Sequence, residues 1–303
     1  MKHSPTSKAH RAAEAAASPL VSAAALRSAI DAGAGADIVL LDASFDLSDL
    51  EAGRRAYEQG HVPGAQYADL DRDLSGPKAA PGPAFTGRHP LPARDAFAAT
   101  AGRWGIGPQT CVVAMDAQGS AYAARVWWLL RWLGHARVWV LDGGIGAWLA
   151  AGGSLTAEPT FASPRAAYPR RPGSMPTIGA ARLAGALGST QVIDARAPER
   201  FRGDVEPLDP VAGHIPGTRN RFFKDNLEAD GAHFKPAAQL AREFSALCDG
   251  AAPAECVHLC GSGVTACHNL LAMQAAGLPG AALYPGSWSE WCADPARPVA
   301  RGA

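Results

Sequence analysis

The fold is decided by the stretch Glu255-Cys-Val-His-Leu-Cys260-Gly-Ser-Gly-Val-Thr265-Ala-Cys-His-Asn-Leu-Leu-Ala-Met-Gln-Ala-Ala-Gly277, which predicts a strand, a tight loop and a helix in succession. Its first residues form a short apolar run that ends at Cys260. After three small residues, 261–263, the apolar residues recur at intervals of three and four, which is the spacing of a helix. The pattern therefore places Cys260 between the end of a buried strand and the start of a helix.

A cysteine in this position is suited to carry negative charge. The N-terminus of a helix offers unpaired backbone N–H groups and the positive end of the helix dipole. Gly261 and Gly263 let the backbone curl so that successive N–H groups point at one centre, which forms an anion-binding nest. Such surroundings lower the pKa of a thiol from its usual value of about 8.5 and favour the nucleophilic thiolate. The sequence therefore predicts that Cys260 is a nucleophile.

Two other interpretations of Cys260 stand beside this one. A buried cysteine often serves only as a small hydrophobic residue. The loop also resembles, in outline, the loop of cysteine phosphatases, which needs an arginine six residues after the nucleophile to hold phosphate. Ala266 occupies that position here, so phosphate chemistry is disfavoured.

Composition sets bounds on the remaining choices. The chain has 303 residues, of which 48% are hydrophobic, and this suffices for two domains of ordinary size. Lys and Arg number 28, as do Asp and Glu, so neither nucleic acid nor an anionic membrane is expected as a partner. No apolar run approaches the roughly 18 residues of a membrane span. Six unevenly spaced cysteines favour free thiols in a reducing cytoplasm. Residues 1–18 lack the apolar core of a secretory signal and are expected to be a frayed tail.

The same series of signals occurs twice along the chain. Each half contains a strand ending in Asp, a Gly-His-[Val/Ile]-Pro-Gly turn, a strand leading into a loop, and a Gly- and Trp-containing segment. The paired landmarks are Asp42 and Asp194, Gly60–Gly64 and Gly213–Gly217, Asp116 and Cys260, and Asp142–Trp148 and Pro285–Trp291. Four matches in one order indicate an internal duplication of about 150 residues. Because strands alternate with helices, each copy is predicted to be an α/β unit, a parallel sheet covered on both faces.

The duplication separates structural features from chemical ones. The turn histidines, His61 and His214, occur in both copies and are therefore expected to fix the turn rather than to catalyse. The loop cysteine occurs only in the second copy, since Asp116 takes its place in the first. No group of His and Cys has metal-ligand spacing, so no metal is expected. The second copy is thus predicted to carry the chemistry.

These features resemble one family, the tandem-domain rhodanese sulfurtransferases. The resemblance rests on the duplicated unit, the loop Cys260–Ala266 and the segment Asp194-Ala-Arg-Ala-Pro-Glu-Arg200-Phe-Arg-Gly203, and it covers about residues 20–300. The Cys-Gly-Ser-Gly-Val-Thr loop looks like the 3-mercaptopyruvate sulfurtransferase branch. The resemblance implies two tandem rhodanese-like domains, a catalytically silent one at residues 19–154 and a catalytic one at 177–301. It also implies a substrate site in the cleft between them. Residues 155–176, rich in Pro and Arg, are expected to be a linker with solvated arginines.

The resemblance also implies the site. Cys260 would carry the transferred sulfur as a persulfide, held by the main-chain N–H groups of the small residues that follow it. Ser262 would bond the substrate carbonyl or help to move the thiol proton. The residues expected to bind substrate are Arg200, Gly261, Gly263, Val264 and Thr265. No cofactor is implied.

One departure from the family concerns the donor. Relatives that use 3-mercaptopyruvate carry a second arginine before the second Gly-His-Ile-Pro-Gly turn, but residues 204–212 contain none and add three acids. The candidates to replace it are Arg202, Arg219, Arg221 and Lys224, each otherwise a surface residue.

The expected reaction is a two-step displacement. The Cys260 thiolate takes sulfur from 3-mercaptopyruvate, pyruvate leaves, and the persulfide passes its outer sulfur to cyanide or a thiol, such as that of a thioredoxin-like reductant. Two alternatives stay open: thiosulfate as the donor, and a persulfide carrier or regulatory module with little turnover.

Overall fold

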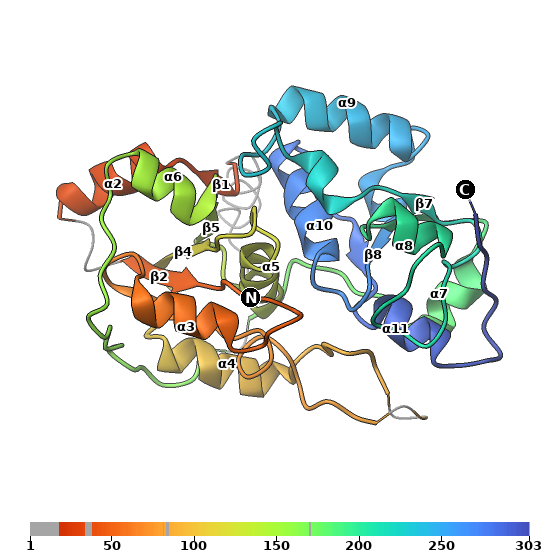
Figure 1. The fold of residues 1–303 in the computed structure, drawn as a ribbon, viewed down its shortest axis with the longest axis horizontal. Helices are drawn as coiled ribbons and strands as arrows, with labels where there is room; N and C mark the ends of the chain where they lie inside the picture. The colour runs from red at the N-terminus through yellow and green to blue at the C-terminus, as the bar shows by residue number, and fades with distance from the viewer. Residues whose placement is uncertain (1–17, 34–37, 81, 83–84, 170, 303) are drawn as a thin grey trace, which may run out of the picture.

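A computed structural model describes residues 18–33, 38–80, 82, 85–169 and 171–302. The predicted tail lies, except for Ser18, outside the described residues. Figure 1 shows two α/β units side by side, each built around its own sheet. The polypeptide completes the first unit before it enters the second, as the duplication in the sequence predicts.

The first sheet has five strands in the order β1-β5-β4-β2-β3, and all neighbouring strands are parallel. The strands are β1 Leu20–Val21, β2 Ile38–Asp42, β3 Ala65–Tyr67, β4 Cys111–Met115 and β5 Val138–Leu141. β2 and β4 are continuous apolar runs because they lie inside the sheet and are covered on both faces. Their carboxyl ends therefore meet at one edge, where Asp42 and Asp116 lie.

In the described part of the first unit, five helices accompany this sheet: α2 Ala23–Asp31, α3 Ala52–Gln59, α4 Arg94–Arg103, α5 Ala123–Leu133 and α6 Gly144–Ala150. α2 and α6 contact each other on one face, and α3 and α4 lie on the opposite face (Figure 1). Ser22 caps α2 by accepting a hydrogen bond from the Ala25 N–H, and the left-handed Gly134 ends α5. The eight residues of α3 contain few large apolar side chains, so apolar spacing does not predict this helix.

The second sheet repeats the first. Its strands are β6 Gln191–Asp194, β7 Arg219–Asn220, β8 Cys256–Leu259 and β9 Ala282–Leu283, in the parallel order β7-β6-β8-β9. This order matches β3-β2-β4-β5, and a parallel bridge from Thr177 to Leu283 takes the place of β1. The remaining elements are α7 Ala180–Ala186, α8 Pro198–Arg202, η2 Phe223–Asn226, α9 Ala237–Leu247, η3 Pro253–Glu255, α10 Ala266–Ala275 and α11 Ser287–Cys292. The prediction of a duplicated α/β unit is confirmed.

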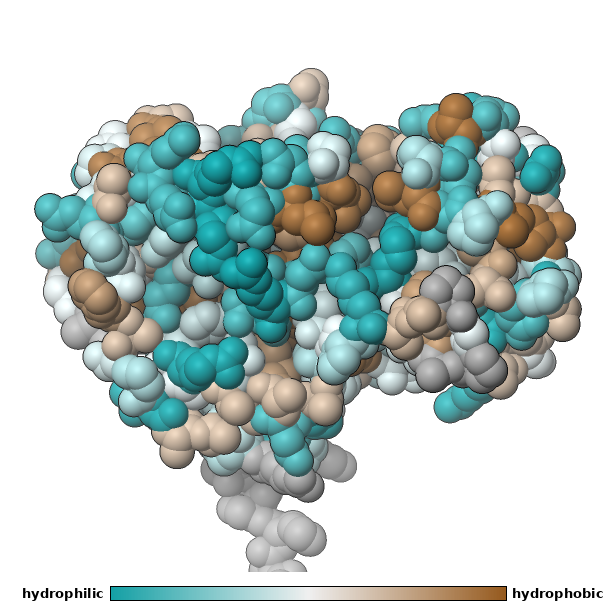
Figure 2. Space-filling view, turned by 60° about the horizontal axis from the view of Figure 1, so that its bottom comes forward, coloured by the Kyte–Doolittle hydropathy of each residue, from teal (hydrophilic) through white to brown (hydrophobic). Residues whose placement is uncertain are grey.

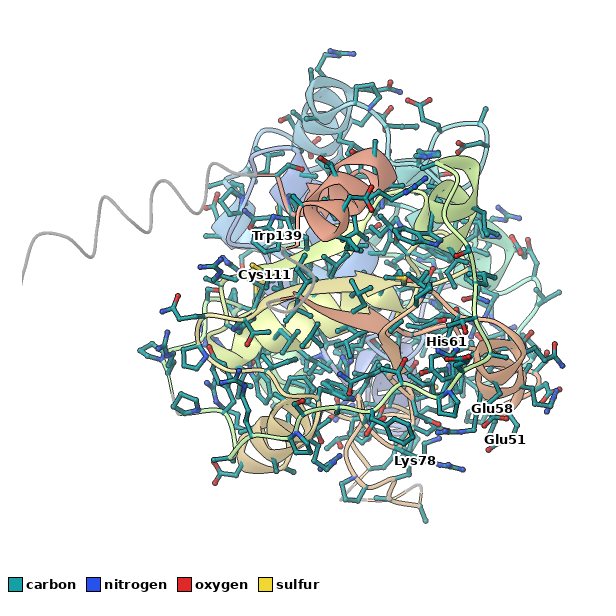
Figure 3. All side chains as sticks on the ribbon, turned by 90° about the vertical axis from the view of Figure 1, so that its left-hand side faces the viewer. Glu51, Glu58, His61, Lys78, Cys111 and Trp139 are labelled. Atoms are coloured by element: carbon teal, nitrogen blue, oxygen red, sulfur yellow. The ribbon has the colours of Figure 1, made fainter. Side chains whose placement is uncertain are left out.

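The two turn histidines have the same structural role, as expected. His61 stacks on Tyr57 with ring centroids 3.9 Å apart, and its Nδ1 lies 2.8 Å from the Tyr57 carbonyl oxygen. His214 stacks on Phe201 at the same distance, and its Nδ1 lies 2.9 Å from the Phe201 carbonyl. Figure 3 shows His61 on the inner side of α3, while Glu58 of that helix points outward. Each histidine thus ties its turn to the preceding helix.

The domains meet through equivalent helices, α5 and α10, which pack against each other. One cluster of buried hydrophobic residues contains side chains of both domains. Among the hydrogen bonds that cross the interface, two run in opposite directions between the equivalent helices and loops. Arg125 Nη1 of α5 donates to the Gly263 carbonyl at 3.0 Å, and His268 Nε2 of α10 lies 3.0 Å from the Gly119 carbonyl. Each domain therefore holds the loop of the other.

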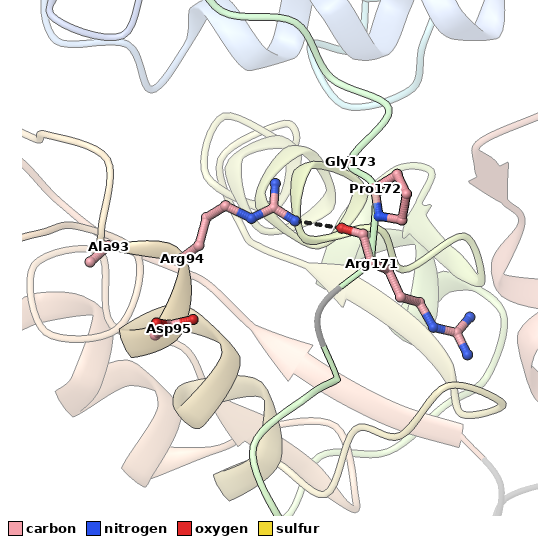
Figure 4. Close-up of a pocket in the computed structure, with 6 residues that line it drawn as sticks. All are labelled: Ala93, Arg94, Asp95, Arg171, Pro172 and Gly173. Atoms are coloured by element: carbon pink, nitrogen blue, oxygen red, sulfur yellow. Dashed lines mark hydrogen bonds between the residues drawn. The ribbon is translucent and has the colours of Figure 1, made fainter.

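Hydrogen bonds attach the linker to the first domain along much of its length. The hydroxyl of Tyr168, a buried residue, lies 3.1 Å from His135 Nδ1. Arg94 bonds the carbonyls of Trp132, Leu133 and Arg171. The last contact borders a surface pocket, where the Arg171 side chain points away from Arg94 (Figure 4). Arg171 is exposed, as expected, and so is Arg165, whereas Arg170 lies outside the described residues.

The surface carries few large hydrophobic side chains. The face in Figure 2 is covered mainly by hydrophilic residues, between which hydrophobic ones form small patches. Scattered apolar residues of this kind are normal on a folded domain. Among the described residues, no helix has the length and apolar character needed to cross a membrane.

Candidate active site

The loop that follows β8 begins at Cys260, at the carboxyl end of an inner strand of the second sheet. The start of α11 holds its first residues. The Cys260 N–H donates to Ser287 Oγ at 3.1 Å, and the Cys260 carbonyl accepts from the Trp288 N–H at 3.0 Å. The Gly261 carbonyl accepts from the Ser289 N–H at 2.9 Å. These bonds use the outer side of the backbone. Cys260 itself lies at the domain interface with 2% of its surface exposed.

The inner side of the backbone is rich in unused donors. In the described part of the chain, the N–H groups of residues 261–265 donate to no acceptor. Buried N–H groups nearly always have a partner, and a row of them without one is therefore a place for an anion. The left-handed Gly263 makes the curl possible: a Cβ on it would collide with the Pro285 carbonyl.

The equivalent loop of the first domain shows what such a row of donors binds. There the Asp116 carboxylate accepts four backbone hydrogen bonds. Its Oδ1 accepts from Gln118 at 2.9 Å and Ser120 at 2.8 Å, and its Oδ2 accepts from Tyr122 at 2.8 Å and Ala123 at 2.9 Å. The first domain thus fills its nest with its own side chain. In the second domain Cys260 stands where that aspartate stands.

Ser262, a predicted site residue, contacts a histidine of the first domain. Its Oγ lies 2.7 Å from His89 Nδ1, and His89 Nε2 lies 3.4 Å from Asp71 Oδ1. Hydrogen bonding from His89 holds the pKa of Asp71 to about 2, so this carboxylate is ionised. The negative charge of Asp71 faces Nε2 and favours a proton there, which leaves Nδ1 as the acceptor for the Ser262 hydroxyl. Burial lowers the pKa of His89 although Asp71 opposes this, and the ring is neutral near pH 7.

The sequence analysis did not single out His89 or Asp71. Both lie in the first domain, which was expected to be catalytically silent, within an irregular stretch between β3 and α4. His89 belongs to none of the paired landmarks, so the comparison of the two copies does not point to it.

A buried ion pair between Arg196 and Asp194 lies next to the loop. Arg196 donates to Asp194 through Nε at 3.0 Å and Nη2 at 2.7 Å, and its guanidinium lies over the Trp288 ring at 4.8 Å. Burial lowers the pKa of Arg196, but Asp194, Glu206 and the nearby Cys260 together raise it on balance. A permanent cation therefore lies close to Cys260, where it favours a negatively charged sulfur.

The structure also places the other predicted site residues. Arg200, on α8, lies close to Gly261: a Cβ built on Gly261 would be 3.5 Å from Arg200 Nη1. Val264 is buried, and Thr265 is the residue directly before α10. Together with Cys260, Ser262 and Gly263, these residues form one continuous loop with Arg200 at its side.

The neighbouring cysteines have other contacts. Cys267 Sγ lies 3.4 Å from the Gly263 carbonyl, and burial raises the pKa of this thiol to about 12. Cys256 Sγ lies 3.1 Å from Cys248 Sγ. Cys267 and Cys256 are both fully buried, so they pack within the domain core. Within the described ranges, no group of three or more His, Cys, Asp or Glu side chains could hold a metal ion.

Comparison with known proteins identifies the relatives of this chain. A family model described as a rhodanese-like domain matches twice, at residues 22–151 and 180–294. A probable 3-mercaptopyruvate sulfurtransferase of Pseudomonas aeruginosa is 49% identical over 269 residues, covering 88% of this chain and 93% of the relative. A putative thiosulfate sulfurtransferase of Mycobacterium tuberculosis is 40% identical over 286 residues, covering 93% and 97%. The solved structure of 3-mercaptopyruvate sulfurtransferase from Leishmania major superimposes with a TM-score of 0.76 at 28% identity, covering 90% of this chain and 74% of that one.

The filled nest of the first domain leads to a prediction about stability. In Asp116→Asn an amide NH₂ replaces one carboxylate oxygen, so two backbone donors lose their acceptor and the others lose a charge-assisted bond. We expect the free energy of unfolding, measured with urea, to fall by roughly 2–4 kcal/mol. Asp31→Asn, at an exposed site on α2, is the control and should change it by less than about 0.5 kcal/mol. Equal stabilities of Asp116→Asn and the wild type would contradict the role assigned to the carboxylate.

Proposed function

The chain belongs to the rhodanese family of sulfurtransferases, and from this premise we propose that its sulfur donor is 3-mercaptopyruvate. The sulfur moves to Cys260, which becomes a persulfide, and then to cyanide or a thiol acceptor, and pyruvate is released. The chain is thus an enzyme that transfers sulfur. The observation that carries the choice of donor is the hydrogen bond between Ser262 and His89 beside the loop, with Asp71 3.4 Å from the other ring nitrogen of His89.

The first step needs both a nucleophile and a proton carrier. The Cys260 thiolate attacks the sulfur of the donor, the new S–S bond forms, and the C–S bond breaks with its electron pair leaving as the enolate of pyruvate. The proton of the donor thiol must reach the carbon of that enolate. Ser262 passes this proton to His89 Nδ1 and then returns it, so that the products are a persulfide anion and pyruvate.

The pair Ser262 and His89 forms a proton relay in this mechanism, and the need for such a relay favours 3-mercaptopyruvate over thiosulfate as the donor. Thiosulfate has no thiol proton, and sulfite leaves without needing a proton on carbon. A histidine held neutral, with its Nδ1 aimed at a serine hydroxyl next to the nucleophile, would have little to do in that reaction. Thiosulfate stays a second candidate for the donor because one relative is named a putative thiosulfate sulfurtransferase.

The nest stabilises the product of this step. A persulfide anion on Cys260 supplies the acceptor that the N–H groups of residues 261–265 lack inside the described structure. Arg196 adds a positive charge nearby. In the second step a cyanide ion or a thiolate attacks the outer sulfur, the S–S bond breaks, and the Cys260 thiolate is restored.

The proposal extends to the sulfur acceptor and the location of the enzyme. A thiol acceptor such as a thioredoxin-like protein would consume the persulfide through its own thiolate. A cytoplasmic location suits this chemistry, and it agrees with six cysteines that are all free thiols.

Donor preference is the direct test of the function. We expect kcat/KM for 3-mercaptopyruvate to exceed that for thiosulfate by at least roughly tenfold, with cyanide as the common acceptor, because only the first reaction uses the proton relay. Pyruvate and thiocyanate should form in equal amounts. A higher value for thiosulfate would identify the enzyme as a thiosulfate sulfurtransferase. Stable sulfur loading without turnover would identify a carrier module.

The role of Cys260 is tested by Cys260→Ser. This variant should form no persulfide and no thiocyanate, because a serine hydroxyl at neutral pH is a poor nucleophile toward sulfur. Mass spectrometry of the protein after donor addition measures the added sulfur atom. Cys111→Ser, at the amino end of β4, is the matched control and should load sulfur as the wild type does. Activity of Cys260→Ser near that of the wild type would refute the assignment.

The relay predicts a defined pH profile. His89 must be neutral to accept a proton, and its pKa is lowered from 6.5 by burial. The kcat/KM for 3-mercaptopyruvate should therefore hold down to about pH 6.5 and fall only at lower pH. His89→Gln should reduce kcat by roughly 100-fold and remove this acid limb. His233→Gln, which alters an exposed histidine paired with Asp230, should leave the profile unchanged. If kcat/KM of His89→Gln still falls at low pH as in the wild type, the fall belongs to the titration of another group.

A further inference from the structure

The second carboxylate-binding arginine expected from the sequence is not among the four residues considered for it. Arg202 is exposed and pairs with Asp204 at 2.7 Å. Arg219 bonds the Leu247 carbonyl and Asp249, and Arg221 pairs with Glu243 at 2.5 Å. Lys224 is exposed on η2. None of these is among the groups nearest to Gly261 of the catalytic loop.

A different arginine lies at the loop, and it comes from the first domain. The three atoms nearest to a Cβ built on Gly261 are all guanidinium nitrogens: Arg88 Nη2 at 2.9 Å, Arg200 Nη1 at 3.5 Å and Arg200 Nη2 at 3.6 Å. Two cations from different domains therefore converge on one point beside the residue that follows Cys260. Like charges gather in this way only where anions lie beside them.

We propose that Arg88 and Arg200 together bind the carboxylate of the donor, and that Asp209 is the internal counterion that this carboxylate displaces. The inference rests on the proposed function, since it concerns the same donor. It differs from the expectation drawn from the sequence in assigning half of the carboxylate site to the first domain.

Domain packing fixes the position of Arg88. Its backbone N–H donates to Ser289 Oγ at 3.2 Å, and Ser289 in turn donates its N–H to the Gly261 carbonyl. The preceding residue, Gly87, adopts φ +98°, and a Cβ on it would lie 2.6 Å from the Gly286 carbonyl. The chain around Arg88 thus lies directly against α11 and the catalytic loop. His89, the next residue, contacts Ser262 from the same segment.

Two buried acids hold the arginines, and they are held differently. Glu206 accepts from Arg200 Nη2 at 2.6 Å and also from the backbone N–H groups of Leu208 and Asp209, at 3.0 and 3.2 Å. Asp209 pairs with Arg88 Nη1 and, at 3.5 Å, with Arg200 Nη2. The Asp209 carboxylate has no backbone donor among the described residues. Asp209 is therefore the acid that an incoming carboxylate can replace, while Glu206 stays in place.

Donors remain available for the substrate. Within the described structure, Arg88 Nη2 and Arg200 Nη1 have no acceptor, and these are the nitrogens nearest to Gly261 on each side chain. One carboxylate could take a hydrogen bond from each. Burial raises the pKa of Asp209 although both arginines oppose this. A singly charged carboxylate fits this site better than a dianion, which would repel Glu206 and Asp209.

The test measures steady-state kinetics of Arg88→Ala, Arg88→Lys and Asp209→Asn with 3-mercaptopyruvate and with thiosulfate. Arg88→Ala should raise KM for 3-mercaptopyruvate by roughly 10- to 100-fold while kcat falls less than threefold, because a charge-assisted bond to a carboxylate distant from the reacting sulfur is lost. Arg88→Lys should recover part of this loss. Arg202→Ala, which removes an exposed arginine from the same helix as Arg200, is the control and should behave as the wild type.

Asp209→Asn provides an independent arm that keeps the side-chain size. Removing the competing carboxylate should lower KM for 3-mercaptopyruvate by roughly threefold or more. It should lower KM for thiosulfate by a larger factor, because the dianion gains more from loss of the negative charge. A KM that is unchanged or raised in Asp209→Asn would overturn the displacement. An unchanged KM in Arg88→Ala would overturn the role of Arg88, as would an equal loss of kcat with both donors, which would mean that Arg88 only positions His89.

Failure of this inference is distinguishable from failure of the proposed function. If the wild type takes up no sulfur from 3-mercaptopyruvate, as judged by mass spectrometry of Cys260, the proposed function falls and this inference falls with it. If the wild type loads sulfur and Arg88→Ala does so with the same concentration dependence, only the inference is overturned.

Discussion

The backbone N–H groups at the start of a helix that follows a buried strand need an acceptor, and this need shapes both halves of the molecule. In the first domain the acceptor is internal, because the Asp116 carboxylate takes four of these bonds. In the second domain Cys260 stands at the same place, and the N–H groups of residues 261–265 have no acceptor within the described residues. A thiolate or a persulfide can supply the missing charge. The same local fold is thus a closed structural unit in one copy and, in our proposal, a reactive one in the other.

The first domain also contributes side chains to the site around Cys260. The first domain contributes His89 and Asp71 beside the reactive loop, and Arg88 at its edge. In our proposal these side chains act at Cys260, which requires that the two domains keep their relative position. The crossed hydrogen bonds of Arg125 and His268 to the loop glycines fix that position, and the shared hydrophobic cluster around α5 and α10 makes it rigid. Arg125 also bonds the His89 carbonyl at 3.3 Å, so one buried side chain connects the loop to the relay.

Local patterns predicted what depends on local interactions. The apolar strands, the helices at α5 and α10 and the paired landmarks gave the duplicated α/β fold, and the small residues after Cys260 indicated the nest. His89, Asp71 and Arg88 could not be found in this way, because they lie in an irregular segment whose course is set by contact with the other domain. The second arginine was sought within residues 202–224, near Arg200 in the sequence, whereas tertiary packing supplies it from a segment more than one hundred positions earlier. α3 was missed because few large apolar residues mark its pattern.

Amide hydrogen exchange of the backbone, followed by mass spectrometry before and after loading with 3-mercaptopyruvate, tests the central claim most directly. The loop peptide that contains residues 261–265 should exchange fast in the free enzyme and become protected when Cys260 carries the added sulfur, because the persulfide then accepts hydrogen bonds from these groups. The peptide that follows Asp116 should be protected in both states. Equal exchange of residues 261–265 with and without the added sulfur would contradict the account.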